Sequence, residues 1–208
     1  MTDEIIKNND LKMFGKWDTN ALVFKDSGVQ QYMCVDPRIV PHTFGIKKKA
    51  IEKAKVNLVE RLINKMMRSG QGKKKLSGKF IRHRMGCGKK EQLIKAVDEA
   101  FDYINKTTKE NPLQVLVTAI ENSAPREDII KLQRGSITYT QAVDVAPMRR
   151  LDEALKNIAL AAFKNTYNNS EDVYKALADE LIAASKADQK SYAVKRRDEI
   201  ERIAQGSR

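Results

Sequence analysis

The residue types that most often carry chemistry in proteins are few in this chain. Two cysteines and two histidines, Cys34, His42, His83 and Cys87, could together supply four zinc ligands. Their spacing lacks the C-x-x-C pair that is typical of zinc sites, so a buried, unligated Cys34 is the better interpretation. With two cysteines and no export signal, the chain is expected in a reducing cytosol.

A thiol nucleophile and a phosphate-binding loop are the next alternatives. Cys87 lies among lysines and near His83, which favours a thiolate. No third residue orients the pair, and no oxyanion donor can be identified. The run GCGKKE is superficially similar to a phosphate-binding loop, but Lys90 stands after Lys89 where that motif needs Ser or Thr. The sequence therefore predicts no catalytic site, no metal and no cofactor.

Positive charge is concentrated in one segment. The chain has a net charge of +12, yet residues 46–95 alone hold 17 Lys and Arg against 3 Asp and Glu. Such a segment repels itself unless a polyanion neutralises it, and nucleic acid is the expected partner. His83 is expected to face that partner. An anionic membrane surface is a weaker alternative, because the segment has no amphipathic Trp/Phe face. No apolar run is long enough to span a membrane.

The run QAVDVAPMRR, residues 141–150, places two arginines where a helix is expected to begin. Positive charge is unfavourable at a helix N-terminus. Either the pair is a solvated helix face, or Arg149 and Arg150 face a shared anion such as phosphate, which would resolve the mismatch. In the second case Asp144 is expected to orient a nearby arginine.

These residues must be positioned by a mainly helical fold. Residues 1–45 mix short apolar pieces with turn residues and predict an extended arm. Apolar residues then recur at helical spacing from Lys47, with Gly70 as a stop. The glycine- and lysine-rich stretch 69–90 is expected to be a mobile contact loop. Helical spacing resumes at Leu93.

The second half of the chain carries clearer signals. Asn111 is expected to cap a nearly all-apolar helix, with Pro112 in its first turn and Gln114 completing a capping box. Period-two alternation around Arg134-Gly135-Ser136 predicts a β-hairpin at about 127–146. Three further helices are expected at 147–166, 170–186 with Ser170 as N-cap, and 190–204.

Several long stretches together resemble the family of the seventh protein of the small ribosomal subunit, in its archaeal and eukaryotic branch. These stretches are PHTFG (41–45), VERLINKMMRSG (59–70), ENPLQVLVTAIENSAPRED (110–128), QAVDVAPMRR (141–150), LADEL (177–181) and SYAVKRRDEIERIA (191–204). The match runs from about residue 32 to the C-terminus in the right order.

The resemblance implies a bundle of about six helices with one long β-hairpin inserted between helices 3 and 4. The chain is therefore expected to consist of an N-terminal arm or extension, residues 1–45, and a helical rRNA-binding domain, residues 46–208. It also implies a non-enzymatic role in the cytoplasmic small ribosomal subunit: binding the 3′ major (head) domain of the rRNA, nucleating head assembly, and lining the exit-site tRNA and mRNA path. Neighbouring head and platform proteins are the expected protein partners, without homo-oligomers or membrane contact.

The resemblance also implies the residues that face RNA. The rRNA-binding set is Lys47, Lys48, Lys49, Lys73, Lys74, Lys75, Lys79, Arg82, Arg84, Lys89, Lys90, Arg149, Arg150, Lys195, Arg196 and Arg197. The hairpin residues near tRNA and mRNA are Arg134, Gly135 and Tyr139.

Two other classes of function remain open at this point. A free nucleic-acid-binding factor would bind duplex DNA and be absent from the small subunit. An RNA-processing enzyme would need a metal or nucleophile, and its RNA turnover would vanish with Cys87→Ala.

Overall fold

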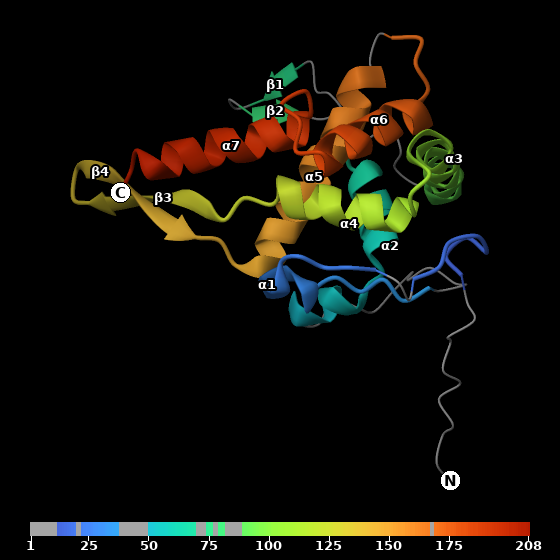
Figure 1. Ribbon diagram of the computed structural model, residues 1–208. Coiled ribbons are helices and arrows are strands. Elements are labelled where there is room, and N and C mark those ends of the chain that lie inside the picture. Colours follow the sequence, from blue (N-terminus) through green and yellow to red (C-terminus); the bar gives the residue numbers. More distant parts are fainter. Residues whose placement is uncertain are drawn as a thin grey trace.

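The computed structural model describes residues 12–19, 22–37, 50–69, 74–76, 79–81, 89–166 and 169–208, and within them the fold is mainly α-helical, as predicted (Figure 1). The helices are α1 (Ser27–Gln30), the 3₁₀ helix η1 (Ala50–Lys55), α2 (Leu58–Met66), α3 (Lys90–Thr108), α4 (Pro112–Ser123), α5 (Pro147–Thr166), α6 (Val173–Ser185) and α7 (Tyr192–Gln205). The strands form two antiparallel hairpins, β1 (Lys74–Leu76) with β2 (Lys79–Ile81) and β3 (Glu127–Arg134) with β4 (Ile137–Asp144).

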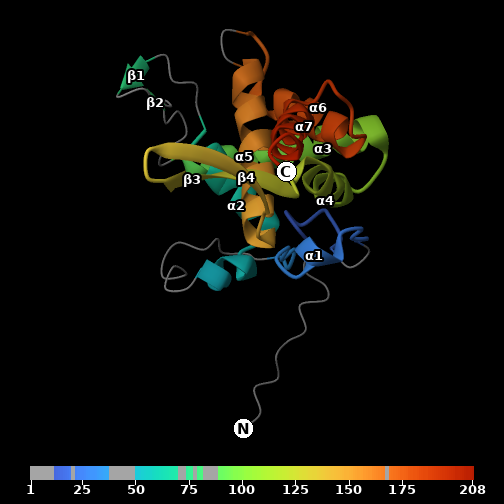
Figure 2. The same cartoon turned by 90° about the vertical axis from the view of Figure 1, so that its left-hand side faces the viewer.

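Helices α2 to α7 form the bundle, and α5 runs through its centre (Figure 2). It contacts α2, α4, α6 and α7, and its Leu151, Leu155 and Ile158 are fully buried. Helix α4 buries eight of its twelve residues, as its nearly all-apolar sequence predicts. Each buried leucine or isoleucine contributes about 1.5–3 kcal/mol, so this apolar centre holds the bundle together.

The first long helix is shorter than predicted. The sequence predicts helical structure from Lys47 to about Gly70, whereas the chain forms η1 and then restarts as α2. Asn57 causes the restart: its side-chain oxygen accepts a hydrogen bond from the Val59 N–H at 2.8 Å. Its amide also donates to the Asp36 carbonyl at 2.7 Å, so the cap is tied to the arm. Residues 47–49 and Gly70 lie outside the described residues.

The long hairpin β3–β4 lies between the third and fourth bundle helices, as predicted. Its register runs from Glu127 paired with Asp144 to Arg134 paired with Ile137, which leaves a two-residue turn. Gly135 takes a φ of +59° there, a conformation that favours glycine. The hairpin extends away from the bundle, and α7 packs along β3 near the C-terminus (Figure 1).

A second, short hairpin falls in the segment whose glycines and lysines predict a loop. Lys74 pairs with Ile81 and Leu76 with Lys79. Three-residue strands are too short for an alternating pattern, and glycine and lysine are poor strand formers, so no sequence signal marked this hairpin.

For the helices in the second half of the chain, the predicted N-terminal residues are only partly confirmed. Asn111 caps α4 by accepting from the Leu113 N–H at 3.0 Å. The expected capping-box role of Gln114 is wrong, because its side chain bonds to the arm instead. Helix α6 begins two residues later than expected, at Val173, with Asp172 rather than Ser170 as N-cap. Helix α7 is capped by Ser191, whose oxygen accepts from the Val194 N–H at 3.2 Å.

The arm, defined here as residues 12–19 and 22–37, packs on the same core. Met13, Val29 and Met33 are buried in the cluster formed by the bundle helices. Polar contacts fix its path: Gln114 accepts from the Val23 N–H at 2.8 Å and donates to the Val23 carbonyl at 2.9 Å. The Glu121 carboxylate accepts from two further arm N–H groups. The bundle therefore holds the arm by backbone recognition as well as by apolar burial.

Candidate nucleic-acid interface

The structure describes only part of the predicted rRNA-binding set. Six of its residues lie outside the described part: Lys47, Lys48, Lys49, Lys73, Arg82 and Arg84. Three others are described through the backbone of β1 and β2 alone: Lys74, Lys75 and Lys79. The remaining seven lie at three places, namely the start of α3, the start of α5 and the first half of α7.

The start of α5 holds the two arginines in different environments. Helix α5 begins at Pro147, and the Ala146 carbonyl accepts from the backbone N–H groups of both arginines. The Arg149 side chain is 66% exposed and its Nη2 lies 3.1 Å from Asp128 Oδ2 on β3. It therefore leaves most of its donors open to solvent.

Arg150, by contrast, is largely buried and forms an ion pair within the protein. Its side chain is only 11% exposed, and its Nη2 lies 2.7 Å from Oδ2 of Asp26 in the arm. Partial burial opposes ionisation of Asp26, but the hydrogen bond and positive charge of Arg150 outweigh it and lower the pKa of Asp26. The adjacent arginines thus do not face one shared anion.

The expected role of Asp144 as the orienting carboxylate is wrong. Asp128 and Asp26 take that role, one for each arginine. Asp26 lies 124 residues from Arg150 in the chain, so no local pattern could have indicated the pair.

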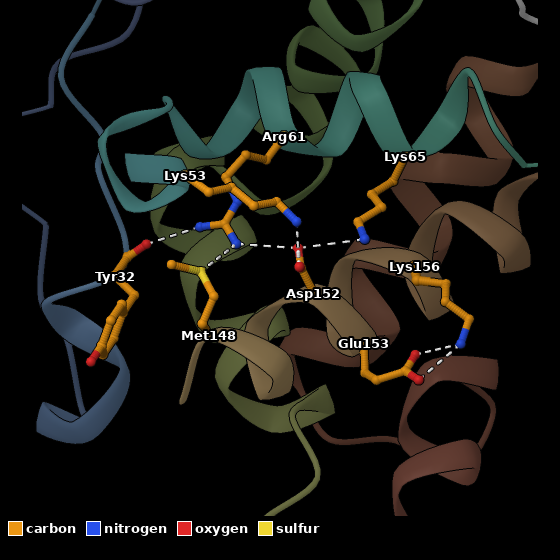
Figure 3. Close-up of polar contacts among 8 residues, drawn as sticks. All are labelled: Tyr32, Lys53, Arg61, Lys65, Met148, Asp152, Glu153 and Lys156. Atoms are coloured by element: carbon orange, nitrogen blue, oxygen red, sulfur yellow. Dashed lines mark hydrogen bonds and ion pairs between the residues drawn. The ribbon is translucent and has the colours of Figure 1, made fainter. Parts of the chain in front are cut away.

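A group of cations on η1 and α2 converges on one carboxylate of α5, and is called the α2–α5 cluster below. Asp152 forms ion pairs with Lys53, with Arg61 at 3.2 Å and with Lys65 at 3.4 Å (Figure 3). Arg61 is 2% exposed, and it also donates to the Tyr32 carbonyl at 3.0 Å. Sequence reasoning missed this cluster, because helical spacing does not distinguish a buried arginine from an exposed one.

Burial and neighbouring charges both shift the pKa values of the residues in the cluster. Burial disfavours the charged form of Asp152, but the hydrogen bond from Lys53 and the charges of the three cations lower its pKa. Burial lowers the pKa of Lys65 and the neighbouring cations lower it further, although Asp152 opposes this. Burial likewise lowers the pKa of Arg61. Three cations therefore share one negative charge in a partly desolvated place.

Beside the cluster is an open cavity of about 370 Å³. Its lining residues are Lys65 from α2, Ala146 before α5, and Met148, Arg149, Asp152, Glu153 and Lys156 from α5. The side chain of Lys156 is 41% exposed and pairs with Glu153 at 2.5 Å (Figure 3). The cavity is thus rimmed by three cationic side chains.

The cations at the start of α3 and in α7 also divide into exposed side chains and side chains that are paired within the protein. Lys89 and Lys195 are exposed. Lys90 lies 2.6 Å from the buried Glu60. Arg197 donates to the Asn122 carbonyl and to Asp198 at 2.6 Å, while Arg196 pairs with Glu199 at 2.5 Å. Arg197 thus helps to fasten α7 to the end of α4.

Two large apolar side chains are exposed close to the tip of the long hairpin. Ile137 is 70% exposed and Tyr139 is 41% exposed, next to Gly135 in the turn. Arg134 is described through its backbone only. Such exposure of large apolar side chains on a projecting hairpin is typical of a contact surface.

The metal and nucleophile candidates receive no support from the described residues. No group of three or more His, Cys, Asp or Glu side chains there could hold a metal ion. Cys34 is partly buried, with its Sγ 3.4 Å from Asp36 Oδ2. The other candidates, His42, His83 and Cys87, lie outside the described residues. Within the described part, no helix has the length and apolar character needed to cross a membrane.

Comparison with known proteins adds an independent observation. The chain matches the family model described as "Ribosomal protein S7p/S5e" over residues 29–208. It is 46% identical over 201 residues to "Small ribosomal subunit protein uS7" of Methanococcus maripaludis, with 96% of this chain and all of that relative covered. The protein of the same name from Methanococcus aeolicus is 43% identical with the same coverage.

Proposed function

Because the chain belongs to the ribosomal protein S7p/S5e family, we propose that it is a structural constituent of the small ribosomal subunit rather than an enzyme. It binds the 3′ major domain of the small-subunit rRNA and nucleates assembly of the head. It acts in the cytoplasm within that subunit, beside other proteins of the head and platform.

The concentration of cations is the observation that carries this proposal. Residues 46–95 hold 17 Lys and Arg against 3 Asp and Glu. In the described part of this segment, three of these cations gather on η1 and α2 around Asp152, and Arg149 lies close by at the start of α5. One face of the bundle is thus suited to a polyanion.

The mechanism is electrostatic anchoring combined with recognition of shape. Lys and Arg neutralise phosphates and release the counterions that surround RNA, which makes binding strongly dependent on salt. The major groove of A-form RNA is too narrow for side chains, so contacts are expected at phosphates, 2′-hydroxyls and unpaired bases. Arginines such as Arg149 add two-point hydrogen bonding to phosphate.

The long hairpin is proposed to line the exit-site tRNA and mRNA path. The exposed ring of Tyr139, two residues from the exposed Ile137, supports this, because aromatic side chains stack on unpaired bases. The hairpin also extends away from the bundle (Figure 1).

Binding of a head-domain rRNA fragment over a range of salt concentrations tests the proposal. Wild-type affinity is expected to fall steeply with salt. Reversing the charges of Lys73, Lys74 and Lys75 to Glu is expected to lower the affinity and to reduce the salt slope by about one unit for each phosphate that the variant no longer neutralises. An unchanged slope would contradict the assignment of these lysines.

Sedimentation separates the proposal from the free nucleic-acid-binding alternative. The protein is expected to co-sediment with the small subunit in a sucrose gradient. A protein found only in the free pool, with a preference for duplex DNA, would contradict the ribosomal role.

A further inference from the structure

A buried carboxylate of α6 closes the N-terminus of α7, and the proposed function does not use it. Glu180 is 5% exposed. Its Oε1 accepts from the Ser191 hydroxyl at 2.7 Å and from the Ala193 N–H at 3.0 Å, and its Oε2 accepts from the Tyr192 N–H at 3.4 Å. The Ser191 hydroxyl in turn accepts from the Val194 N–H at 3.2 Å. Glu180 and Ser191 therefore satisfy the first three N–H groups of α7, which a helix leaves without backbone partners.

These bonds, called the Glu180 latch below, join two stretches that the sequence singles out, LADEL (177–181) and SYAVKRRDEIERIA (191–204). A carboxylate is favoured at a helix N-terminus, and its bonds to N–H groups are charge-assisted. Apolar packing of α7 is slight by comparison. Of its fourteen residues, Ala193, Val194 and Ala204 are the ones that are buried, and all three have small side chains. The latch therefore contributes a large share of what holds α7 on the bundle.

A second polar contact holds α7 further along the helix. The Arg197 side chain donates to the Asn122 carbonyl at the end of α4. It lies about one and a half turns beyond the latch. A helix held at one point can tilt about that point, whereas two points fix its direction. Without the Glu180 latch, the direction of α7 is less well fixed.

The far end of α7 carries the long hairpin. Strands β3 and β4 both pack against α7, which extends from the bundle along the hairpin (Figure 1). At the base of the hairpin the Arg126 N–H donates to the Glu201 carboxylate at 2.9 Å. The Ser207 hydroxyl, just after α7, lies 3.4 Å from that of Thr140 on β4. The ion pair between the hairpin and the start of α5 is exposed and contributes little.

We propose that Glu180 is a positioning residue for the long hairpin, an inference that rests on the proposed role of the hairpin at the tRNA and mRNA path. The Glu180 latch fixes the direction of α7, and α7 in turn sets the orientation of β3 and β4. Helix α7 is about 21 Å long, so a tilt of about 10° at its N-terminus displaces the hairpin at its far end by about 4 Å. Such a displacement exceeds the tolerance of a hydrogen bond or a stacked ring.

Distances between two spin labels test the positioning role in the full-length protein. One label is placed at Ser136→Cys in the hairpin turn and the other at Asn64→Cys, an exposed position of α2. Cys34→Ser and Cys87→Ser remove the native thiols. In the folded Glu180→Gln variant we expect the distance distribution to broaden, or its centre to shift by about 4 Å.

Two further variants show whether the change comes from the latch. Ser191→Ala is expected to give the same change as Glu180→Gln, and the double variant no larger one, because the two residues act as a unit. Val97→Ala removes buried volume from α3 and is the control for lost stability alone. It is expected to keep the wild-type distribution. An unchanged distribution in Glu180→Gln, or an equal change in Val97→Ala, would overturn the positioning role and leave the proposed function intact.

Binding of exit-site tRNA by small subunits reconstituted with each protein separates this inference from the proposed function. Glu180→Gln is expected to weaken tRNA binding about threefold, while its affinity for head-domain rRNA stays within about twofold of the wild type. Tyr139→Ala removes an exposed ring of the hairpin itself. If Tyr139→Ala left tRNA binding unchanged, the proposed function of the hairpin would fail, whatever the distances showed. If Tyr139→Ala weakened tRNA binding and Glu180→Gln displaced the hairpin without weakening it, the inference would be overturned.

Discussion

Ion pairs hold the arm on the bundle and also hold the α2–α5 cluster together, but the two places differ in their ratio of charges. At the arm each cation has at least one carboxylate, whereas in the cluster the cations outnumber the carboxylate. Where the arm meets the bundle, Arg150 pairs with Asp26, and Lys16 pairs with both Asp98 and Asp102. In the cluster, three cations share Asp152. Ion pairs with at least one carboxylate for each cation are satisfied within the protein. In the cluster the cations outnumber the carboxylate, so they are not all satisfied in this way. Arg149 has a carboxylate of its own but stays 66% exposed, so charge balance and side-chain exposure together separate structural cations from those available to RNA.

The largest expected effect is on stability, at the centre of the cluster. Asp152→Asn leaves the buried Arg61 without its carboxylate, and an uncompensated buried charge is costly. We expect the free energy of unfolding to fall by about 3 kcal/mol, measured by urea denaturation with an unchanged m-value.

Glu110→Gln removes an exposed carboxylate just before α4 and is the control. It is expected to change the free energy of unfolding by less than about 0.5 kcal/mol. If Asp152→Asn were as stable as this control, the cluster would not contribute to the fold, and the comparison with the arm would lose its basis.

The pair between the arm and α5 is expected to contribute less. Arg150→Gln and Asp26→Asn should each lower the free energy of unfolding by about 1–2 kcal/mol, since both side chains are largely buried. A double-mutant cycle measures their coupling. Additive losses in the double variant would show that the two residues act separately and that the arm is held by other contacts.

The ion pair of Asp26 also has a consequence for pH dependence. Its pKa is lowered below the ordinary 3.8 by Arg150, despite partial burial. A carboxylate with a lowered folded-state pKa contributes stability above its unfolded pKa, and this is lost as the pH falls through the folded pKa. Between about pH 5 and about pH 2 the wild type should therefore lose more stability than Asp26→Asn. Parallel thermal denaturation of the two proteins measures this, and equal losses would contradict it.

Much of the fold could be predicted because it follows from local patterns. The apolar stripes of the helices, the Asn111 cap and the Gly135 turn each depend on residues a few positions apart. The partners of the cations could not be predicted, because they join distant parts of the chain: Arg150 to Asp26, and Arg61 to Asp152. The resemblance implied which cations face RNA, but only the three-dimensional contacts distinguish Arg149 from Arg150.

This distinction gives the smallest expected effect on stability and the sharpest test of the comparison. Arg149 is 66% exposed, so Arg149→Gln should change the free energy of unfolding by less than about 0.5 kcal/mol, because an exposed ion pair contributes little. It should nevertheless weaken rRNA binding and reduce the salt slope, and Arg149→Glu should do so more strongly. Arg150→Gln should show the reverse, with lower stability and a salt slope close to that of the wild type. If the two adjacent substitutions affected stability and rRNA binding alike, the exposure of a paired cation would not decide whether it binds RNA.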